Sequence, residues 1–363
     1  MNGGALLIRN LLLERNLPNV LSGIESLDEW EKQREVLKDL LCKYEYGYFP
    51  EKPKEVKFEI IETDSHFCAS NVVLQKIKLT VSFHNGDYSF PFYFACPSAN
   101  GKYKTIVHIS FSPHVPDKFM PSEELADNGF AVASFFYEDV TSDNDDFSNG
   151  ISGLLYPDGK RSEDSAGKIS IWAWAAMRIM DFLETHEKVD LSKISIAGHS
   201  RLGKTALLTA ALDERFAFVF ANNSGCSGAA ISRGKVGETI EKINLSFPYW
   251  FCKSYKQFSN KEIEMPFDQH FLLALIAPRK IYVSSAEDDM WADPTSEFLS
   301  CVAASSVYEK IYADNGLVHD DSLPEAGVSL HDGNIGYHKR AGTHYLSRYD
   351  WNQFMDFVKR HSK

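Results

Sequence analysis

The chain reads Ile194-Ser-Ile-Ala-Gly-His-Ser-Arg-Leu-Gly-Lys204 at its most informative point. A short apolar, β-branched run enters a turn of small residues with Ser200 at its tip, and a helical Ala- and Leu-rich segment, Thr205 to Leu212, follows. A nucleophilic serine requires this strand–turn–helix context, because a tight turn must push the hydroxyl out of the sheet edge. Gly198 and Gly203 leave room for the strand and helix to approach closely. The stretch therefore predicts an α/β fold with Ser200 as the nucleophile of a serine hydrolase.

Length and charge narrow the classes of partner. The 363 residues carry 38 basic and 50 acidic side chains, a net charge of −12. This balance disfavours nucleic acid and anionic membrane as partners. No run approaches the roughly 20 apolar residues of a membrane span. The expected partner is a small molecule or an oligosaccharide, and the oligomeric state stays open.

The cysteines and the first residues bear on location and on metals. The six cysteines are widely spread, without a CxxC or CxxH pattern, which disfavours a structural zinc site. We expect them to be reduced thiols, as in a cytosolic protein. The N-terminal apolar stretch is short, is broken by Arg9, Glu14 and Arg15, and precedes no small-residue cleavage site. A cytoplasmic location is the expectation.

The order of elements around the serine predicts the fold class. A helical pattern covers residues 25–44, and strand-like runs follow at 56–60, 72–83 and 88–95, with a hairpin turn at Asn85-Gly86-Asp87. Strands and helices then alternate: strands at 105–111, 130–136, 216–221 and 280–284, helices at 121–128, 169–185 and 349–359, and a long polar loop at 138–168. An antiparallel entry followed by parallel strands with intervening helices is the α/β-hydrolase order.

We therefore expect a three-layer αβα arrangement whose central sheet is mostly parallel, with antiparallel N-terminal strands. The prediction is a single domain over residues 1–363. It has a helical N-terminal extension over about 1–50 and an elaborated insert over about 225–275.

A serine hydroxyl needs an adjacent imidazole base, and in this fold the order along the chain is serine, acid, histidine. The histidine candidates are His319, His331, His338 and His344. His344 is favoured because it follows Gly342 in a short loop directly before the terminal helix. The other three are expected in a polar surface loop.

The acid is expected just after the strand at 279–285, where the chain reads Ala286 to Pro294. Four carboxylates compete there: Glu287, Asp288, Asp289 and Asp293. Trp291 and Pro294 favour an ordered site over a solvated loop, but the pattern alone does not choose among the acids. For the oxyanion, the backbone N–H of Arg201 is the expected donor, and a second could come from residues 110–114.

Several long motifs, in this order, resemble the glucuronoyl esterases, carbohydrate esterase family fifteen, particularly their bacterial branch. The resemblance spans most of the chain, from the helix around Trp30 to Tyr349-Asp-Trp351. The motifs are Gly198 to Lys204, Asn222 to Ala230, Gly237-Glu-Thr239, Ser285 to Pro294 and Gly342-Thr-His344. The resemblance implies a serine esterase that hydrolyses esters of 4-O-methyl-glucuronic acid and needs no metal or organic cofactor. An intracellular form is expected to act on xylan-derived fragments or small uronate esters.

The resemblance also implies roles for individual residues. Ser200 corresponds to the nucleophile, His344 to the base and Arg201 to an oxyanion stabiliser. Lys204, Glu238 and Trp291 match positions that contact the uronate sugar. The chemistry fits, since lysine donates to hydroxyls, glutamate accepts from them and tryptophan offers an apolar face to a ring.

One position departs from the family pattern. Many members carry the triad acid as a glutamate where this chain has Asn223, and an amide cannot stabilise an imidazolium by charge. Asp289 matches the position of an acid that some members use after the later strand. We therefore assign Asp289 as the acid, with Asp288 in reserve.

Two other functions remain open from the sequence. An acetyl-xylan or other carbohydrate deacetylase would use the same triad. A non-catalytic carbohydrate-binding relative is suggested by Asn223, and a structure without a carboxylate within hydrogen-bond reach of His344 Nδ1 would favour it.

Overall fold

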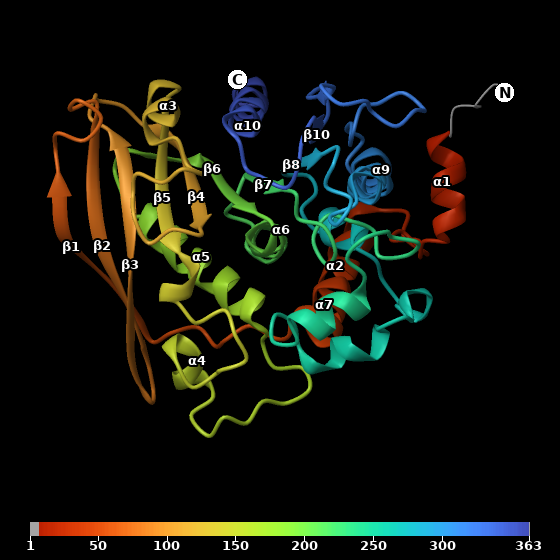
Figure 1. Cartoon of the computed structure of the whole chain (residues 1–363), viewed down its shortest axis with the longest axis horizontal. Helices are drawn as coiled ribbons and strands as arrows, with labels where there is room; N and C mark the ends of the chain where they lie inside the picture. The colour runs from red at the N-terminus through yellow and green to blue at the C-terminus, as the bar shows by residue number, and fades with distance from the viewer. Residues whose placement is uncertain (1–6, 363) are drawn as a thin grey trace.

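A computed structural model describes residues 7–362 and shows one mixed sheet with helices on both faces (Figure 1). The order of strands across the sheet is β1-β2-β3-β5-β4-β6-β7-β8-β10-β9. The strands are β1 (Glu55–Asp64), β2 (Val72–Phe83), β3 (Gly86–Pro97), β4 (Tyr103–Ser110), β5 (Phe130–Phe136), β6 (Val189–His199), β7 (Phe218–Asn222), β8 (Lys280–Ala286), β9 (Ser329–Leu330) and β10 (Ile335–Arg340).

The strand directions match the predicted fold class. Strands β1 to β3 pair antiparallel, and β3 pairs antiparallel with β5. From β5 through β4, β6, β7 and β8 to β10 every pairing is parallel, and β9 runs antiparallel at the edge. The carboxyl ends of β6, β7, β8 and β10 therefore lie side by side, which is where an α/β sheet presents its site.

The helices divide between the two faces of the sheet. They are α1 (Ile8–Arg15), α2 (Leu27–Leu41), α3 (Ser122–Asp127), α4 (Gly150–Leu155), α5 (Lys168–Leu183), α6 (Arg201–Leu212), α7 (Ile240–Ser246), α8 (His270–Ala274), α9 (Pro294–Ile311) and α10 (Arg348–Arg360). A π-helical turn spans Cys42–Tyr46, and 3₁₀ turns span Tyr137–Asp139, Lys253–Phe258 and Glu262–Glu264. Helices α3 and α10 cover one face, and α5, α6 and α9 cover the other (Figure 1).

Alternation along the strands produces these two cores. On β4, Ile106 belongs to the core under α10, whereas Val107 and Ile109 belong to the larger core under α5 and α6. On β6, Ala197 belongs to the core under α10 and Ile196 to the larger core. Successive side chains of a strand point to opposite faces, so a sheet covered on both sides has continuous apolar strands.

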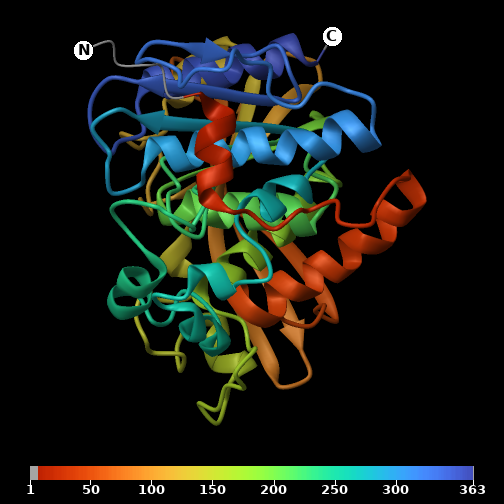
Figure 2. The same cartoon turned by 90° about the vertical axis from the view of Figure 1, so that its right-hand side faces the viewer.

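The N-terminal segment packs along one side of the molecule (Figure 2). Helix α1 crosses α9, and α2 runs obliquely below them in the view of Figure 2. A capping box starts α2, because the Ser26 hydroxyl accepts from the Glu29 N–H while the Glu29 carboxylate accepts from the Ser26 N–H. Residues 1–6, where the predicted extension begins, lie outside the described residues.

Several local predictions were wrong. Phe83 pairs with Gly86, so the hairpin turn is at His84-Asn85, one residue earlier than predicted. Helix α4 lies inside the predicted loop over 138–168, and neither α9 nor β10 was predicted. His338 is fully buried on β10 rather than in a surface loop. Its burial is tolerated because Asp350 accepts a hydrogen bond from its Nε2 at 2.8 Å.

All six cysteines are free thiols, and five of them are buried. Over residues 7–362, the structure contains no helix with both the length and the apolar character that a membrane crossing requires.

Candidate active site

Ser200 occupies the turn between β6 and α6 in a backbone conformation that few residues adopt. Its φ of 57° and ψ of −126° lie outside the regions favoured by side-chain-bearing residues. Its N–H donates to the carbonyl of Asn222 at the end of β7, at 2.9 Å. A Cβ atom on Gly198 would overlap the carbonyl of Leu202, so the close approach of strand and helix requires glycine there. The turn is thus the predicted strained elbow, with Ser200 at the N-terminus of a helix.

A pocket of about 140 Å³ opens above Ser200. Every predicted site residue except Asp289 lines it, although these residues come from segments up to 144 positions apart (Ser200 to His344). The lining residues are Ser200, Arg201, Lys204, Asn223, Ser224, Gly225, Glu238, Phe247, Trp250, Trp291, Ala292 and His344. Residues 110–114, suggested for a second oxyanion donor, are not among them.

Asp289 lies behind His344. The Nδ1 atom of His344 is 2.6 Å from Oδ2 of Asp289. An ionised carboxylate only accepts, so Nδ1 carries the proton and Nε2 is left as the basic nitrogen. Of the competing carboxylates, Glu287 and Asp288 are exposed and Asp293 caps α9 by accepting from Ser296. A carboxylate is therefore within reach of His344 Nδ1, contrary to the arrangement that would favour a non-catalytic relative.

Asn223 supports the same carboxylate. It has a positive φ of 46° at the end of β7, and its Nδ2 donates to Asp289 Oδ2 at 2.7 Å. Burial raises the pKa of Asp289, but the hydrogen bond and charge of His344 and the bond from Asn223 outweigh it, so the pKa lies below its usual value. The Asn223 amide thus stabilises the ionised form of Asp289.

His199 packs beneath His344, with ring centroids 4.5 Å apart. Its Nδ1 lies 2.5 Å from the side-chain oxygen of Asn222. Burial and the nearby His344 lower the pKa of His199 to about 3, so this ring stays neutral and adds no charge next to the His344 imidazole.

Arg201 is fixed by a carboxylate that the sequence did not single out. Its Nη1 donates to Oδ2 of Asp143, which also accepts from the Tyr137 hydroxyl at 3.0 Å. The other carboxylate oxygen accepts from the Trp250 indole at 2.7 Å, and the guanidinium lies 4.8 Å from the centroid of that indole. Asp143 is one of several acids in a polar loop, so no local pattern distinguished it. As the first residue of α6, Arg201 also has a backbone N–H without an intrahelical partner.

Lys204 and Glu238 form the buried polar side of the pocket. Lys204 Nζ donates to the carbonyl of Ser224 at 2.6 Å and lies 3.5 Å from Glu238 Oε2. The N–H of Glu238 donates to the carbonyl of Trp291, whose side chain is 51% exposed at the rim. Lys242 Nζ lies 5.3 Å from the centroid of that indole. The pocket therefore combines paired charges at its base with an accessible aromatic face at its mouth.

Glu297 holds the loop that forms the floor of the pocket. Its carboxylate accepts from the Gly225 N–H at 2.8 Å, from the Ser224 hydroxyl at 3.2 Å and from the Ser285 hydroxyl at 2.6 Å. Complete burial raises its pKa to about 7 despite these bonds.

This raised pKa predicts a pH dependence of stability. The unfolded chain releases the Glu297 proton near the usual glutamate pKa, whereas the folded chain keeps it until about pH 7, so the free energy of unfolding falls as pH rises between these values. Replacing Glu297 by Gln should remove this component. The free energy of unfolding, measured with urea, should therefore fall less between about pH 5 and about pH 8 in the variant than in the wild type. Glu287→Gln, at an exposed carboxylate, is the matched control. Equal losses in the wild type and Glu297→Gln would contradict the prediction.

Comparison with protein families gives a direct match. The model described as "Glucuronyl esterase, fungi" matches residues 79–311. The carbohydrate esterase MZ0003 from an unknown prokaryotic organism is 40% identical over 66% of this chain and 55% of its own length. The 4-O-methyl-glucuronoyl methylesterase of Podospora anserina is 28% identical over 76% of this chain and 55% of its own length. The chain therefore spans about half the length of these two relatives.

Solved structures match over nearly the whole chain. A glucuronoyl esterase from Solibacter usitatus has a TM-score of 0.87 and 30% identity, covering 95% of this chain and 97% of that one. A CE15 glucuronoyl esterase from Teredinibacter turnerae T7901 has a TM-score of 0.88 and 27% identity, covering 100% and 94%. These likenesses confirm the predicted α/β-hydrolase fold class.

Proposed function

Because the chain belongs to the glucuronoyl esterase family, carbohydrate esterase family fifteen, we propose that it is a serine esterase that hydrolyses esters of (4-O-methyl-)glucuronic acid. One observation carries the proposal: Ser200 and the Asp289-supported His344 open into the same pocket as Arg201, Lys204, Glu238 and Trp291. The names of the Podospora anserina and Solibacter usitatus proteins give the substrate class.

In the first step, Nε2 of His344 takes the proton of the Ser200 hydroxyl as its oxygen attacks the ester carbonyl. Negative charge develops on the former carbonyl oxygen, where the backbone N–H and guanidinium of Arg201 stabilise it. The ester C–O bond then breaks, and the alcohol leaves with the proton held by His344. The product of this step is a uronoyl ester of Ser200.

In the second step, His344 takes a proton from water, whose oxygen attacks the same carbonyl carbon. The tetrahedral species collapses, the bond to Ser200 breaks, and the proton returns to the serine oxygen. Asp289 holds the imidazole in the required tautomer through both steps and stabilises the imidazolium by charge.

The sugar is bound by the remaining pocket residues. Lys204 donates to ring hydroxyls, Glu238 accepts from them, and Trp291 packs against the ring. Lys204 and Glu238 are already paired with each other, so each is oriented before the sugar arrives. Xylan-derived fragments are the proposed source of the uronate ester.

The test compares an ester of the sugar's carboxyl group with an acetate ester of a sugar hydroxyl. Purified protein is given benzyl or methyl glucuronate and, separately, an acetylated xylo-oligosaccharide, with Ser200→Ala as the blank. Serine-dependent release of glucuronic acid, without acetate release, is the expected result. Release of acetate alone would overturn the proposed substrate in favour of a carbohydrate deacetylase, and release of neither would overturn the proposed activity.

A further inference from the structure

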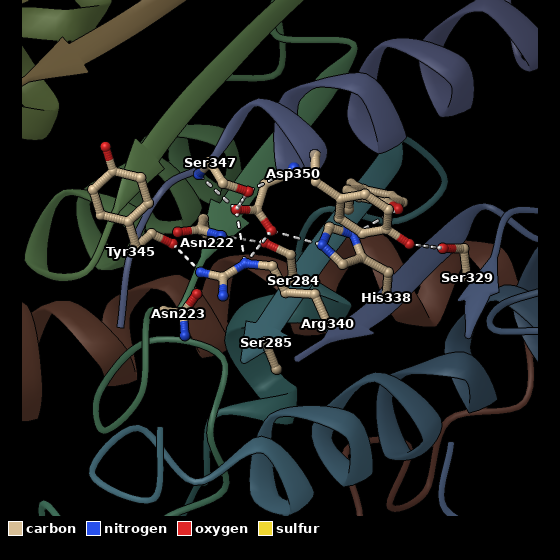
Figure 3. A network of polar contacts seen from close by, with 12 residues as sticks. Asn222, Asn223, Ser284, Ser285, Ser329, His338, Arg340, Tyr345, Ser347 and Asp350 are labelled. Carbon is tan, nitrogen blue, oxygen red and sulfur yellow. Dashed lines mark hydrogen bonds and ion pairs between the residues drawn. The ribbon is translucent and has the colours of Figure 1, made fainter. Parts of the chain in front are cut away.

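The loop that carries His344 wraps around one arginine side chain. Arg340 is the last residue of β10, and its guanidinium lies inside the loop that follows (Figure 3). Its Nη2 donates to the carbonyls of Thr343 and Tyr345, at 3.1 and 2.5 Å, and its Nη1 donates to the carbonyl of Ala341 at 3.0 Å. Two of these carbonyls belong to the residues on either side of His344. The fork of the guanidinium therefore fixes the backbone from which His344 projects.

The arginine is held in turn by Asp350, whose side chain is completely buried at the start of α10. Arg340 Nε lies 3.0 Å from both carboxylate oxygens. His338 Nε2 is 2.8 Å from Oδ1, and the N–H and hydroxyl of Ser347 both donate to Oδ2 at 2.7 Å (Figure 3). Each contact is from a donor, which is the environment of an ionised carboxylate.

The charge state of Asp350 agrees with this geometry. Burial raises its pKa, but the hydrogen bonds from His338 and Ser347 and the charges of His338 and Arg340 outweigh it and leave the pKa below its usual value. Asp350 can therefore anchor the guanidinium as a carboxylate. It also closes the capping box with Ser347, so the same side chain fixes the start of α10 and the end of the loop.

The His344 side chain bonds Asp289 and packs on His199, but the backbone of the loop has few other hydrogen bonds. Residues 341 and 343–345 are exposed, and Gly342 has a φ of 94°. The N–H groups of Glu287 and Asp288 donate to the carbonyls of Arg340 and Gly342, at 2.8 and 3.0 Å, so the turn bearing the acid contacts only the near side of the loop. The Arg340 side chain donates to the backbone carbonyls of Thr343 and Tyr345, the two residues that flank His344.

We infer that Arg340, anchored by Asp350, is a positioning residue for the base: its guanidinium holds the His344 loop so that the imidazole faces both Asp289 and Ser200. The inference rests on the proposed role of His344. A displacement of about 1 Å in a reacting group can cost about 10²-fold in rate, so loss of the Arg340 hydrogen bonds to the backbone on both sides of His344 should lower kcat.

Two substitutions of Arg340 test the inference. Arg340→Met removes all its donors at similar length, and Arg340→Lys keeps a cation against Asp350 but loses the simultaneous bonds to the three carbonyls. Both should lower kcat by about 10²-fold and leave KM nearly unchanged, since the sugar contacts are untouched. Both should also weaken the low-field proton resonance of the short His344–Asp289 hydrogen bond, assigned by its loss in His344→Gln.

Arg348→Met is the matched control, because Arg348 is exposed on the first turn of α10 and its ion pair among residues 7–362 is with Glu124. Arg348→Met should keep the wild-type kcat and the proton resonance of the His344–Asp289 hydrogen bond. The resonance is recorded without substrate, so it tests the loop even if glucuronate esters prove not to be hydrolysed. Folded Arg340→Lys protein that retains wild-type kcat and resonance would overturn the inference, as would lowered thermal stability with neither changed. If Arg340→Met does not fold, Arg340→Lys decides.

Discussion

Replacing His344 by glutamine should lower kcat for a glucuronate ester by about 10⁶-fold, because the proposed mechanism routes the Ser200 proton through the His344 imidazole. Glutamine can still donate a hydrogen bond to Asp289, so the loop and the pocket should remain folded. The measurement is single-turnover and steady-state hydrolysis of the benzyl ester, with circular dichroism to check folding.

Two further variants sharpen this expectation. Ser200→Ala should lose a similar amount, and the double variant should be no worse than either, because members of a triad act as one unit. His319→Gln, at a partly exposed histidine in the loop before β9, should retain wild-type kcat. Activity in His344→Gln close to that of His319→Gln would refute the assignment of the base.

Replacing Asp289 by asparagine should lower kcat by about 10⁴-fold while the fold stays intact. The amide matches the carboxylate in shape but removes the negative charge that stabilises the imidazolium, and its NH₂ group favours the wrong histidine tautomer. The measurement is kcat, with thermal unfolding as a check on stability. Asp288→Asn, at the neighbouring exposed carboxylate, should be nearly silent, and full activity in Asp289→Asn would contradict the assignment of the acid.

The position of Asn223 provides a rescue experiment. Its side chain meets Asp289 at Oδ2, the atom that also contacts His344, so a carboxylate introduced at 223 would lie next to the imidazole. Asn223→Glu should be tolerated alone and should restore part of the activity lost in Asp289→Asn. A double variant no more active than Asp289→Asn would show that a glutamate at 223 does not reach His344 in this chain.

Local pattern was sufficient to predict the turn at Ser200 and much of the sheet. The turn at Ser200 could be predicted because a strained elbow demands glycines and a strand–helix junction at fixed offsets. Strand β5 and helix α5 were predicted nearly at their observed bounds because each carries a clear apolar pattern. The choice of Asp289 among four acids needed the family resemblance, since exposure and capping of the other three appear only in three dimensions.

The elements that were missed lack such patterns. Helix α9 is buried on most of its sides between α1, α8 and the sheet, so it has no polar stripe to produce a helical period. Strand β10 ends in His338-Lys-Arg340, a polar run that looks like surface until Asp350 is placed beside it. Asp143, Glu297 and Arg340 act through partners 58, 72 and 10 residues away, respectively, and nothing local marks them.

The pairing of the two cations at the pocket has a consequence for product release. Hydrolysis converts a neutral ester into a free uronate, which carries a negative charge that the substrate lacks. Arg201 is already paired with Asp143, and Lys204 lies against Glu238, so neither offers the uronate an uncompensated positive charge. The departing acid therefore gains little electrostatic attraction over the ester. We therefore expect only weak inhibition by free glucuronate, so that the proposed hydrolysis continues as its product accumulates.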